Sequence, residues 1–156
     1  MTTREADEFL KSYFKKFPEN KDYMSTTINF CRKSGYVNNI FGRRTHITGI
    51  NDKNFNVRNF QERAAINAPI QGSASELMRM AVINIYEKIK VKKLKDCKLL
   101  LQIHDELIFE VKKDNIKSTK KSIESGMRSI QKSDLHSFSI PILVDVNIGE
   151  NWGLLQ

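Results

Sequence analysis

Residues 60–91 carry the longest helical pattern in the chain, and they constrain its fold more than any other segment. The apolar side chains of this pattern recur at helical spacing: Ala64, Ala65, Leu77, Met78, Met80, Ala81, Ile85 and Ile89. Pro69 lies inside the pattern, and a proline removes a backbone donor and clashes with the preceding turn of a helix. We therefore predict a short helix that ends near Asn67 and a longer helix that begins near Pro69.

Two further helices are predicted before this segment. Aromatic and aliphatic side chains follow one helical stripe through residues 4–17, and Pro18 ends that pattern. A second helix is predicted to end near Ser34 and Gly35, because glycine readily takes the left-handed conformation at a helix C-terminus. The N-terminal part of the chain is therefore expected to be mainly helical.

The segment between these helices predicts a hairpin and a loop. Residues 35–44 contain two short β-prone runs around Asn38 and Asn39, which tolerate the positive φ angles of hairpin turns. Residues 51–59 hold four asparagines and no clear period, so they predict an internal loop. This loop supplies the best candidate boundary, and we divide the chain into residues 1–59 and 60–156.

The second part of the chain predicts strands as well as a helix. Apolar runs at residues 99–103 and 107–111 flank a polar trio and predict two strands with the trio at their tip. Residues 116–130 predict a helix, and residues 140–146 predict a final strand. The expected fold class is α+β, in which helices accompany a small antiparallel sheet built from the hairpin and the closing strand.

The charge balance points toward polyanions. Lysine and arginine number 26 against 18 aspartates and glutamates, which gives a formal net charge of +8. Simple solubility is an equally good explanation of that charge taken alone. Lysines crowd residues 88–98, where they indicate either a solvated connection or a patch that faces phosphates.

The cysteines and the hydropathy exclude several classes of protein. Cys31 and Cys97 lie far apart, without a CxxC pair or a histidine cluster, which argues against a zinc site or a disulfide scaffold. We expect a reducing, cytoplasmic location. No apolar run approaches the roughly 18 residues needed to cross a bilayer, so no membrane partner is expected.

The polar trio His104-Asp105-Glu106 is the first candidate site. A carboxylate at a strand-turn-strand tip is held firmly yet open to ions, which suits a hard cation such as Mg²⁺. Neighbouring side chains on extended backbone point to opposite faces, so only one of Asp105 and Glu106 can aim directly at a given metal pair. An acidic surface hairpin is the alternative.

A row of hydrogen-bond donors is the second candidate site. Arg63, Asn67 and Gln71 recur every four residues and share one helical face if Pro69 bends the axis without rotating it far. Minor-groove edges of DNA offer purine N3 and pyrimidine O2 acceptors in every base pair, so such a row can check pair geometry without reading sequence. The alternative is the solvated polar face of a helix.

Four ordered motifs give these sites a family context. They are Gly35-Tyr36-Val37 with Phe41-Gly42-Arg43-Arg44, the segment from Glu62 to Gly72, the segment from Gln102 to Leu107, and Gly149-Glu150-Asn151-Trp152. From about Thr3 to Trp152, the chain resembles the C-terminal part of family A DNA polymerases, the bacterial DNA polymerase I family. The resemblance assigns residues 1–59 to the remainder of the fingers and residues 60–156 to the palm.

The resemblance implies nucleotidyl transfer, in which a primer 3′-hydroxyl attacks the α-phosphate of a deoxynucleoside triphosphate with two Mg²⁺ ions. Asp105 matches a metal carboxylate of the family, and Glu106 matches a neighbouring acid with a supporting role. His104 matches the residue that contacts the primer terminus. The implied partners are primer-template DNA and deoxynucleoside triphosphates, in replication or repair.

The resemblance also implies roles for the basic and amide side chains. Arg63, Asn67 and Gln71 match minor-groove contacts near the growing end of the primer. Arg43 and Arg44 match a basic pair that serves either packing or contact with the DNA backbone, and both alternatives stay open.

One part of the family pattern is missing from this sequence. The family takes a second metal carboxylate from an Asp-Tyr-Ser-Gln-Ile-Glu type motif on an earlier strand, and that motif appears nowhere here. We therefore expect the chain to supply half of the Mg²⁺ site, to be inactive alone, and to need an N-terminal polymerase segment as partner. Alternative hypotheses are a non-catalytic basic DNA-binding module and an inactive remnant.

Overall fold

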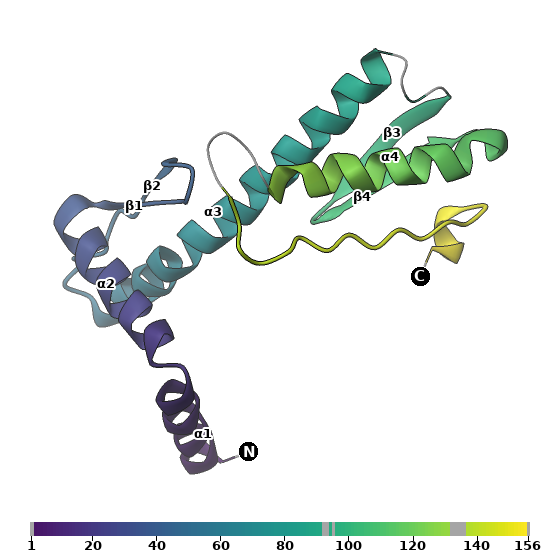
Figure 1. The fold of residues 1–156 in the computed structure, drawn as a ribbon. Helices are drawn as coiled ribbons and strands as arrows, with labels where there is room; N and C mark the ends of the chain where they lie inside the picture. The colour runs from purple at the N-terminus through teal and green to yellow at the C-terminus, as the bar shows by residue number, and fades with distance from the viewer. Residues whose placement is uncertain (1, 92–93, 95, 132–136, 156) are drawn as a thin grey trace. The chain divides into compact units, whose positions relative to one another are not determined.

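The computed structural model describes residues 2–91, 94, 96–131 and 137–155 (Figure 1). The chain forms two compact units, an N-terminal unit (Met1–Ser73) and a C-terminal unit (Ala74–Gln156), and each is described by itself. The division at residues 59 and 60, which follows the fingers and palm of the resembled family, stays a prediction. In the part of the chain that is described, no helix is both long and apolar enough to cross a membrane.

The N-terminal unit begins with the two predicted helices. Helix α1 (Thr3–Lys16) starts in a capping box: the Thr2 hydroxyl accepts the Glu5 backbone N–H, and the Glu5 carboxylate accepts the Thr2 N–H. Helix α2 (Pro18–Ser34) has proline in its first turn and ends at Gly35, whose φ of +78° is left-handed. Both predicted helices are confirmed, with the boundary between them at Phe17.

The predicted hairpin is present, but its turn lies elsewhere. Strands β1 (Tyr36–Asn38) and β2 (Arg44–His46) pair antiparallel, with Asn38 opposite Arg44. Residues 39–43 form the loop, and Gly42 takes the positive φ (+80°) that was expected at the asparagines. Asn38 is therefore part of β1, and the left-handed residue of the loop is Gly42.

Helix α3 (Phe55–Lys90) corrects two predictions. The predicted loop over residues 51–59 ends at Asn54, because the Asp52 side chain accepts the Asn54 backbone N–H and the Asn54 side chain accepts the Asn56 backbone N–H, in turns that start the helix. The predicted break near Pro69 is also absent, and the helix is continuous through it. The Ser73 hydroxyl donates to the Pro69 carbonyl at 2.6 Å, which adds a bond to this stretch of the helix.

A small apolar core joins the elements of the N-terminal unit. It contains one residue from α2, one from β1, two from the segment after β2, and one from α3: Cys31, Val37, Ile47, Ile50 and Ala65. Helix α1 contributes no buried residue to this core, and Phe9 and Tyr13 of its aromatic stripe are exposed. The core therefore fixes the hairpin between α2 and the first half of α3.

The C-terminal unit is built on the predicted hairpin. Strands β3 (Cys97–Ile103) and β4 (Glu106–Val111) pair antiparallel, with a register shift between Leu99 and Leu101. A short 3₁₀ turn, η1 (Lys113–Asn115), leads into α4 (Ile116–Arg128), which continues as η2 (Ser129–Gln131). Ile85, Leu94, Cys97 and Ile123 form the buried core between α3, the hairpin and α4.

The predicted final strand over residues 140–146 is not observed. Each sheet of the described residues has two strands, and this segment pairs with neither. Pro141 cannot donate to a ladder, and Ile140 and Leu143 are 78% and 80% exposed. The chain ends with the 3₁₀ turn η3 (Trp152–Leu154). The sheet is therefore smaller than expected, although the α+β class is confirmed.

A glycine sets the close approach of α4 to α3. A Cβ atom added to Gly126 would lie 3.1 Å from Ile85 Cγ1, and Ile85 is fully buried. We expect Gly126→Ala to lower the free energy of unfolding by about 1 to 3 kcal/mol through overpacking. Urea denaturation followed by circular dichroism measures this loss.

Gly72→Ala is the matched control, since its nearest neighbour would lie at 3.6 Å, an ordinary contact. Alanine favours a helix interior over glycine by about 0.5 to 1 kcal/mol, so this variant should be neutral or stabilised. Equal destabilisation of both variants would contradict the packing argument.

Candidate nucleic-acid interface and metal carboxylates

A groove of about 410 Å³ crosses the N-terminal unit between the end of β2 and one face of α3. Its lining residues are Thr45, Ile47, Phe60, Arg63, Ala64, Asn67, Ala68 and Gln71. The continuous helix keeps the three predicted donors on one face, so all of them line the groove. The predicted shared face of Arg63, Asn67 and Gln71 is therefore confirmed as geometry.

The chemistry of this groove favours an acceptor-rich ligand. A guanidinium and two amides supply donors, while Ile47, Phe60 and the two alanines supply an apolar wall. None of its lining residues is acidic. The groove can therefore donate hydrogen bonds to a polyanion without an opposing negative charge.

The hairpin beside the groove carries exposed cations. The Arg44 guanidinium lies 4.6 Å from the centre of the Tyr36 ring, which itself packs edge-on against Phe30. Tyr36 also faces His46, directly opposite it in the strand pairing. This stacking describes how Arg44 packs, and a DNA-backbone contact by either Arg43 or Arg44 stays a prediction.

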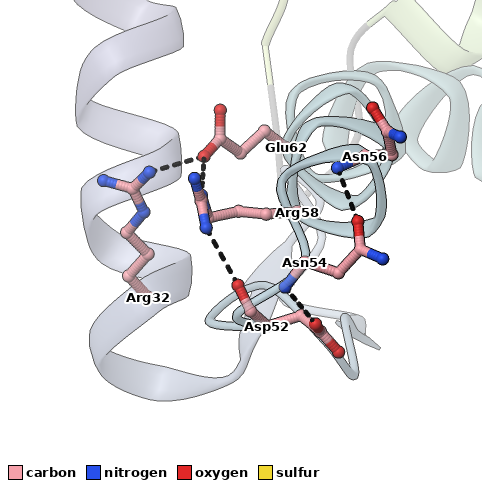
Figure 2. Close-up of polar contacts among 6 residues, drawn as sticks. All are labelled: Arg32, Asp52, Asn54, Asn56, Arg58 and Glu62. Atoms are coloured by element: carbon pink, nitrogen blue, oxygen red, sulfur yellow. Dashed lines mark hydrogen bonds and ion pairs between the residues drawn. The ribbon is translucent and has the colours of Figure 1, made fainter.

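An ionic network fixes the start of α3 against α2 (Figure 2). The Glu62 carboxylate accepts a hydrogen bond from Arg32 of α2 and lies 4.0 Å from Arg58 Nε. Arg58 in turn donates to the Asp52 carbonyl at 3.0 Å, so the network closes over the loop that begins the helix. Glu62 directly precedes Arg63, and the network therefore positions the helix that carries the donor row.

Sequence reasoning quoted Glu62 only as part of a motif and missed this role. The available signal was the spacing of Arg58 and Glu62, which lie one helical turn apart. Arg32 could not be paired with Glu62 from the sequence, since the contact depends on how α2 packs on α3.

The C-terminal unit presents the polar trio at the tip of the β3–β4 hairpin. His104 takes a left-handed φ of +51° at the first turn position, and Asp105 completes the turn. Glu106 is already in β4, opposite Ile103. All three residues are exposed. Their predicted placement at the tip is confirmed, while their chemical roles stay predictions.

The tip fits one contribution to a cation site. Asp105 supplies an exposed carboxylate in the turn, and its oxygen atoms are the ligands that Mg²⁺ prefers. No group of three or more His, Cys, Asp and Glu that could hold a metal ion exists among the described residues. These residues therefore fit part of a two-metal centre and do not fit a complete one.

Each unit has one buried thiol in its core. Cys31 and Cys97 are unpaired, and burial raises the pKa of each thiol. Both thiols therefore stay protonated at neutral pH, the form that is neither a good nucleophile nor a metal ligand. They act as small apolar core residues.

The sequence matches the model of DNA polymerase family A over residues 1–154. The chain belongs to this family. It is 37% identical to DNA polymerase I of Caldicellulosiruptor bescii over 156 residues, and 42% identical to that of Rhizobium leguminosarum over 149 residues. These alignments cover 97% and 95% of the chain but only 17% and 15% of the relatives, so the chain spans about a sixth of their length.

A solved structure supports the fold as well. The polymerase domain of Pol1 from M. smegmatis, in complex with DNA primer-template and dNTP, matches with a TM-score of 0.89 at 34% sequence identity. The match covers 99% of this chain and 26% of that one. The fold of this chain is therefore that of part of a family A polymerase domain.

The Glu62 network should contribute measurably to stability. Glu62 is 21% exposed and has two guanidinium partners, so Glu62→Gln should lower the free energy of unfolding by about 1 kcal/mol. Chemical denaturation monitored by circular dichroism measures the change.

Glu8→Gln provides the matched control. Glu8 pairs with Arg4 on the surface of α1, where both side chains are largely exposed, so a change of only a few tenths of a kcal/mol is expected. The network would be energetically unimportant if the two variants unfolded alike.

Proposed function

We propose that this chain is part of a DNA-directed DNA polymerase that adds nucleotides to a primer on a template strand. The observation that carries the proposal is the groove in which three donor side chains stand in a row along α3. Membership of the DNA polymerase A family supports it, as does the DNA primer-template in the similar M. smegmatis structure. Replication or repair is the corresponding process, and the location stays the cytoplasm predicted from cysteine usage.

In this proposal, the donor row contacts the minor groove of the primer-template duplex. Asn67 and Gln71 donate amide hydrogen bonds to purine N3 and pyrimidine O2, and Arg63 adds a charged donor at the other end of the row. Every correct base pair presents these acceptors in the same place. The row therefore tests the shape of the duplex and carries little sequence preference.

The tip of the β3–β4 hairpin contributes to nucleotidyl transfer. Asp105 would hold Mg²⁺, which supplies stabilisation of the attacking and leaving oxygens when it is bound. Glu106 would support the charge balance of the tip, and His104 would contact the primer terminus. The incoming substrate is a deoxynucleoside triphosphate.

The chain alone is proposed to be catalytically incomplete. Two cations held roughly 3.5 to 4 Å apart need carboxylates on both sides, and the tip offers Asp105 from one side. A segment with the further carboxylate, such as an N-terminal polymerase segment, would complete the centre. The second candidate function, a non-catalytic DNA-binding module, is favoured by the donor-lined groove and the net charge of +8.

The DNA-binding part of the proposal is tested with the chain alone. Asn67→Ala and Gln71→Ala should each weaken binding to a primer-template duplex by roughly 3- to 10-fold, the loss of one hydrogen bond. Fluorescence anisotropy at fixed salt measures the affinity. Asn20→Ala, an exposed amide on α2 that bonds Tyr13, should leave the affinity unchanged. Unaltered binding in both groove variants would remove the assigned role of the row.

The catalytic part is tested in a chimera. Residues 1–154 replace the matching segment of a related DNA polymerase I, and primer extension is measured with Mg²⁺ and all four nucleotides. The chimera should extend a primer, the chain alone should not, and Asp105→Asn in the chimera should lower the rate at least 100-fold.

Each result separates the candidate functions. A chimera that binds DNA but cannot extend it would favour the non-catalytic module. Extension by the chain alone, abolished by Asp105→Asn, would show that the chain or a second copy supplies the further carboxylate and that the incompleteness argument is wrong.

A further inference from the structure

We propose that Asn39 and Ser73 form a clamp that positions the basic loop of the β1–β2 hairpin beside the groove. The clamp would control how many phosphates the hairpin reaches, although neither side chain needs to touch DNA. This inference rests on the proposed DNA-binding function and adds two positioning residues to it.

Asn39 uses its whole side chain inside the protein. It is 8% exposed, and its Oδ1 atom accepts the backbone N–H groups of Phe41 at 3.0 Å and Arg43 at 2.9 Å. Its Nδ2 atom donates to the Gly72 carbonyl of α3 at 3.2 Å. One amide therefore folds the loop over residues 39–43 and ties that loop to the helix.

Ser73 makes the second connection between the same two segments. It is also 8% exposed, and its hydroxyl accepts the Ile40 backbone N–H at 3.2 Å while donating to the Pro69 carbonyl. Asn39 and Ser73 are the buried polar side chains among the described residues of the N-terminal unit. Both side chains lie at the contact between the hairpin loop and α3. The buried polar side chains described in this unit therefore hold the loop against α3.

The clamp lies next to one end of the groove. On α3, Gly72 and Ser73 directly follow Gln71, the last donor of the row. On the hairpin, the loop bound by Asn39 leads into Arg43 and Arg44 and then into Thr45, which lines the opposite wall. The clamp therefore fixes the separation of the two walls at the Gln71 end of the groove.

The buried hydrogen bonds of the clamp favour a single position of the hairpin loop relative to α3. Breaking a single bond leaves a buried donor or acceptor without a partner, which costs about 1 to 3 kcal/mol. The loop ends in Arg43, and Arg44 begins β2, so the direction of the loop decides whether these two charges lie beside a duplex seated on the donor row. The number of phosphate contacts should therefore depend on Asn39 and Ser73.

The salt dependence of binding measures that number. The logarithm of the binding constant falls with the logarithm of salt concentration by about 0.9 for each phosphate contact on duplex DNA. A variant that only lowers the folded fraction weakens binding at every salt concentration and leaves this slope unchanged. The slope therefore separates a positioning role from a purely structural one.

The test uses the full chain with two uncharged clamp variants, Asn39→Ser and Ser73→Ala. Asn39→Ser shortens the side chain so that it cannot bridge to Gly72, and Ser73→Ala removes one oxygen and leaves a good helix former. Asn51→Ser is the matched control, since Asn51 also donates its amide to a carbonyl, that of Arg32, away from the groove. The double variant Arg43→Ala, Arg44→Ala gives the slope without the hairpin charges.

Binding of a primer-template duplex is measured from low to moderate salt, at a temperature where melting curves show every variant to be folded. We expect the slope of each clamp variant to fall by about 0.9 to 1.8, toward that of the arginine double variant. The slope of Asn51→Ser should match that of the unmodified chain. Ser73→Ala alone decides the test if Asn39→Ser does not fold.

Three results would overturn the clamp. Unchanged slopes in the folded clamp variants would assign Asn39 and Ser73 to stability alone. An unchanged slope in the arginine double variant would show that the hairpin reaches no phosphate, while weaker binding by Asn67→Ala would still support the donor row. An unmodified chain that binds no DNA would overturn the clamp and the proposed DNA-binding function together.

Discussion

The unbroken course of α3 through Pro69 is the constraint on which the groove depends. A proline at this position cannot donate to the carbonyl one turn earlier, so the helix loses one bond of its ladder. Two side-chain bonds lie on either side of that gap: the Tyr23 hydroxyl donates to the Ile66 carbonyl, and the Ser73 hydroxyl donates to the Pro69 carbonyl. The helix stays regular enough that residues four apart remain on one face.

Three kinds of contact hold neighbouring elements against α3. The ion pairs of Glu62 hold its start against α2, the apolar core around Ala65 seats the hairpin, and the clamp at Gly72 and Ser73 holds the loop. Ionic, apolar and neutral polar contacts thus follow one another along the helix. The groove lies on the face that these contacts leave open.

The sequence predicts the local elements well and their tertiary bonds poorly. Helical stripes, the glycine at the end of α2 and the apolar runs around Asp105 identify most elements, because each depends on neighbouring residues. The prediction of a break at Pro69 is wrong. The Tyr23 hydroxyl bonds this stretch of α3 from α2, a contact that no local pattern reveals. The predicted strand over residues 140–146 is also wrong, because β-prone residues form a strand only where a partner strand exists.

The residues of the candidate sites also differ in whether local sequence reveals them. Arg63, Asn67 and Gln71 could be grouped by spacing, and the tip position of Asp105 by the strands that flank it. Asn39 could not be found this way, because its importance lies in a bond to a residue 33 positions later. The ordered motifs indicate the family, whereas the contacts that shape the groove join residues far apart in the sequence and are seen only in the folded chain.

Helix α1 has a consequence for the exchange of backbone hydrogens with solvent. It buries no side chain, so its structure rests on its capping box, its surface ion pairs and the lysines of its last turn. An isolated helix of 14 residues is only marginally stable in water. Its amides would therefore exchange far faster than those of α2, and slower exchange would reveal that another surface has covered its aromatic stripe.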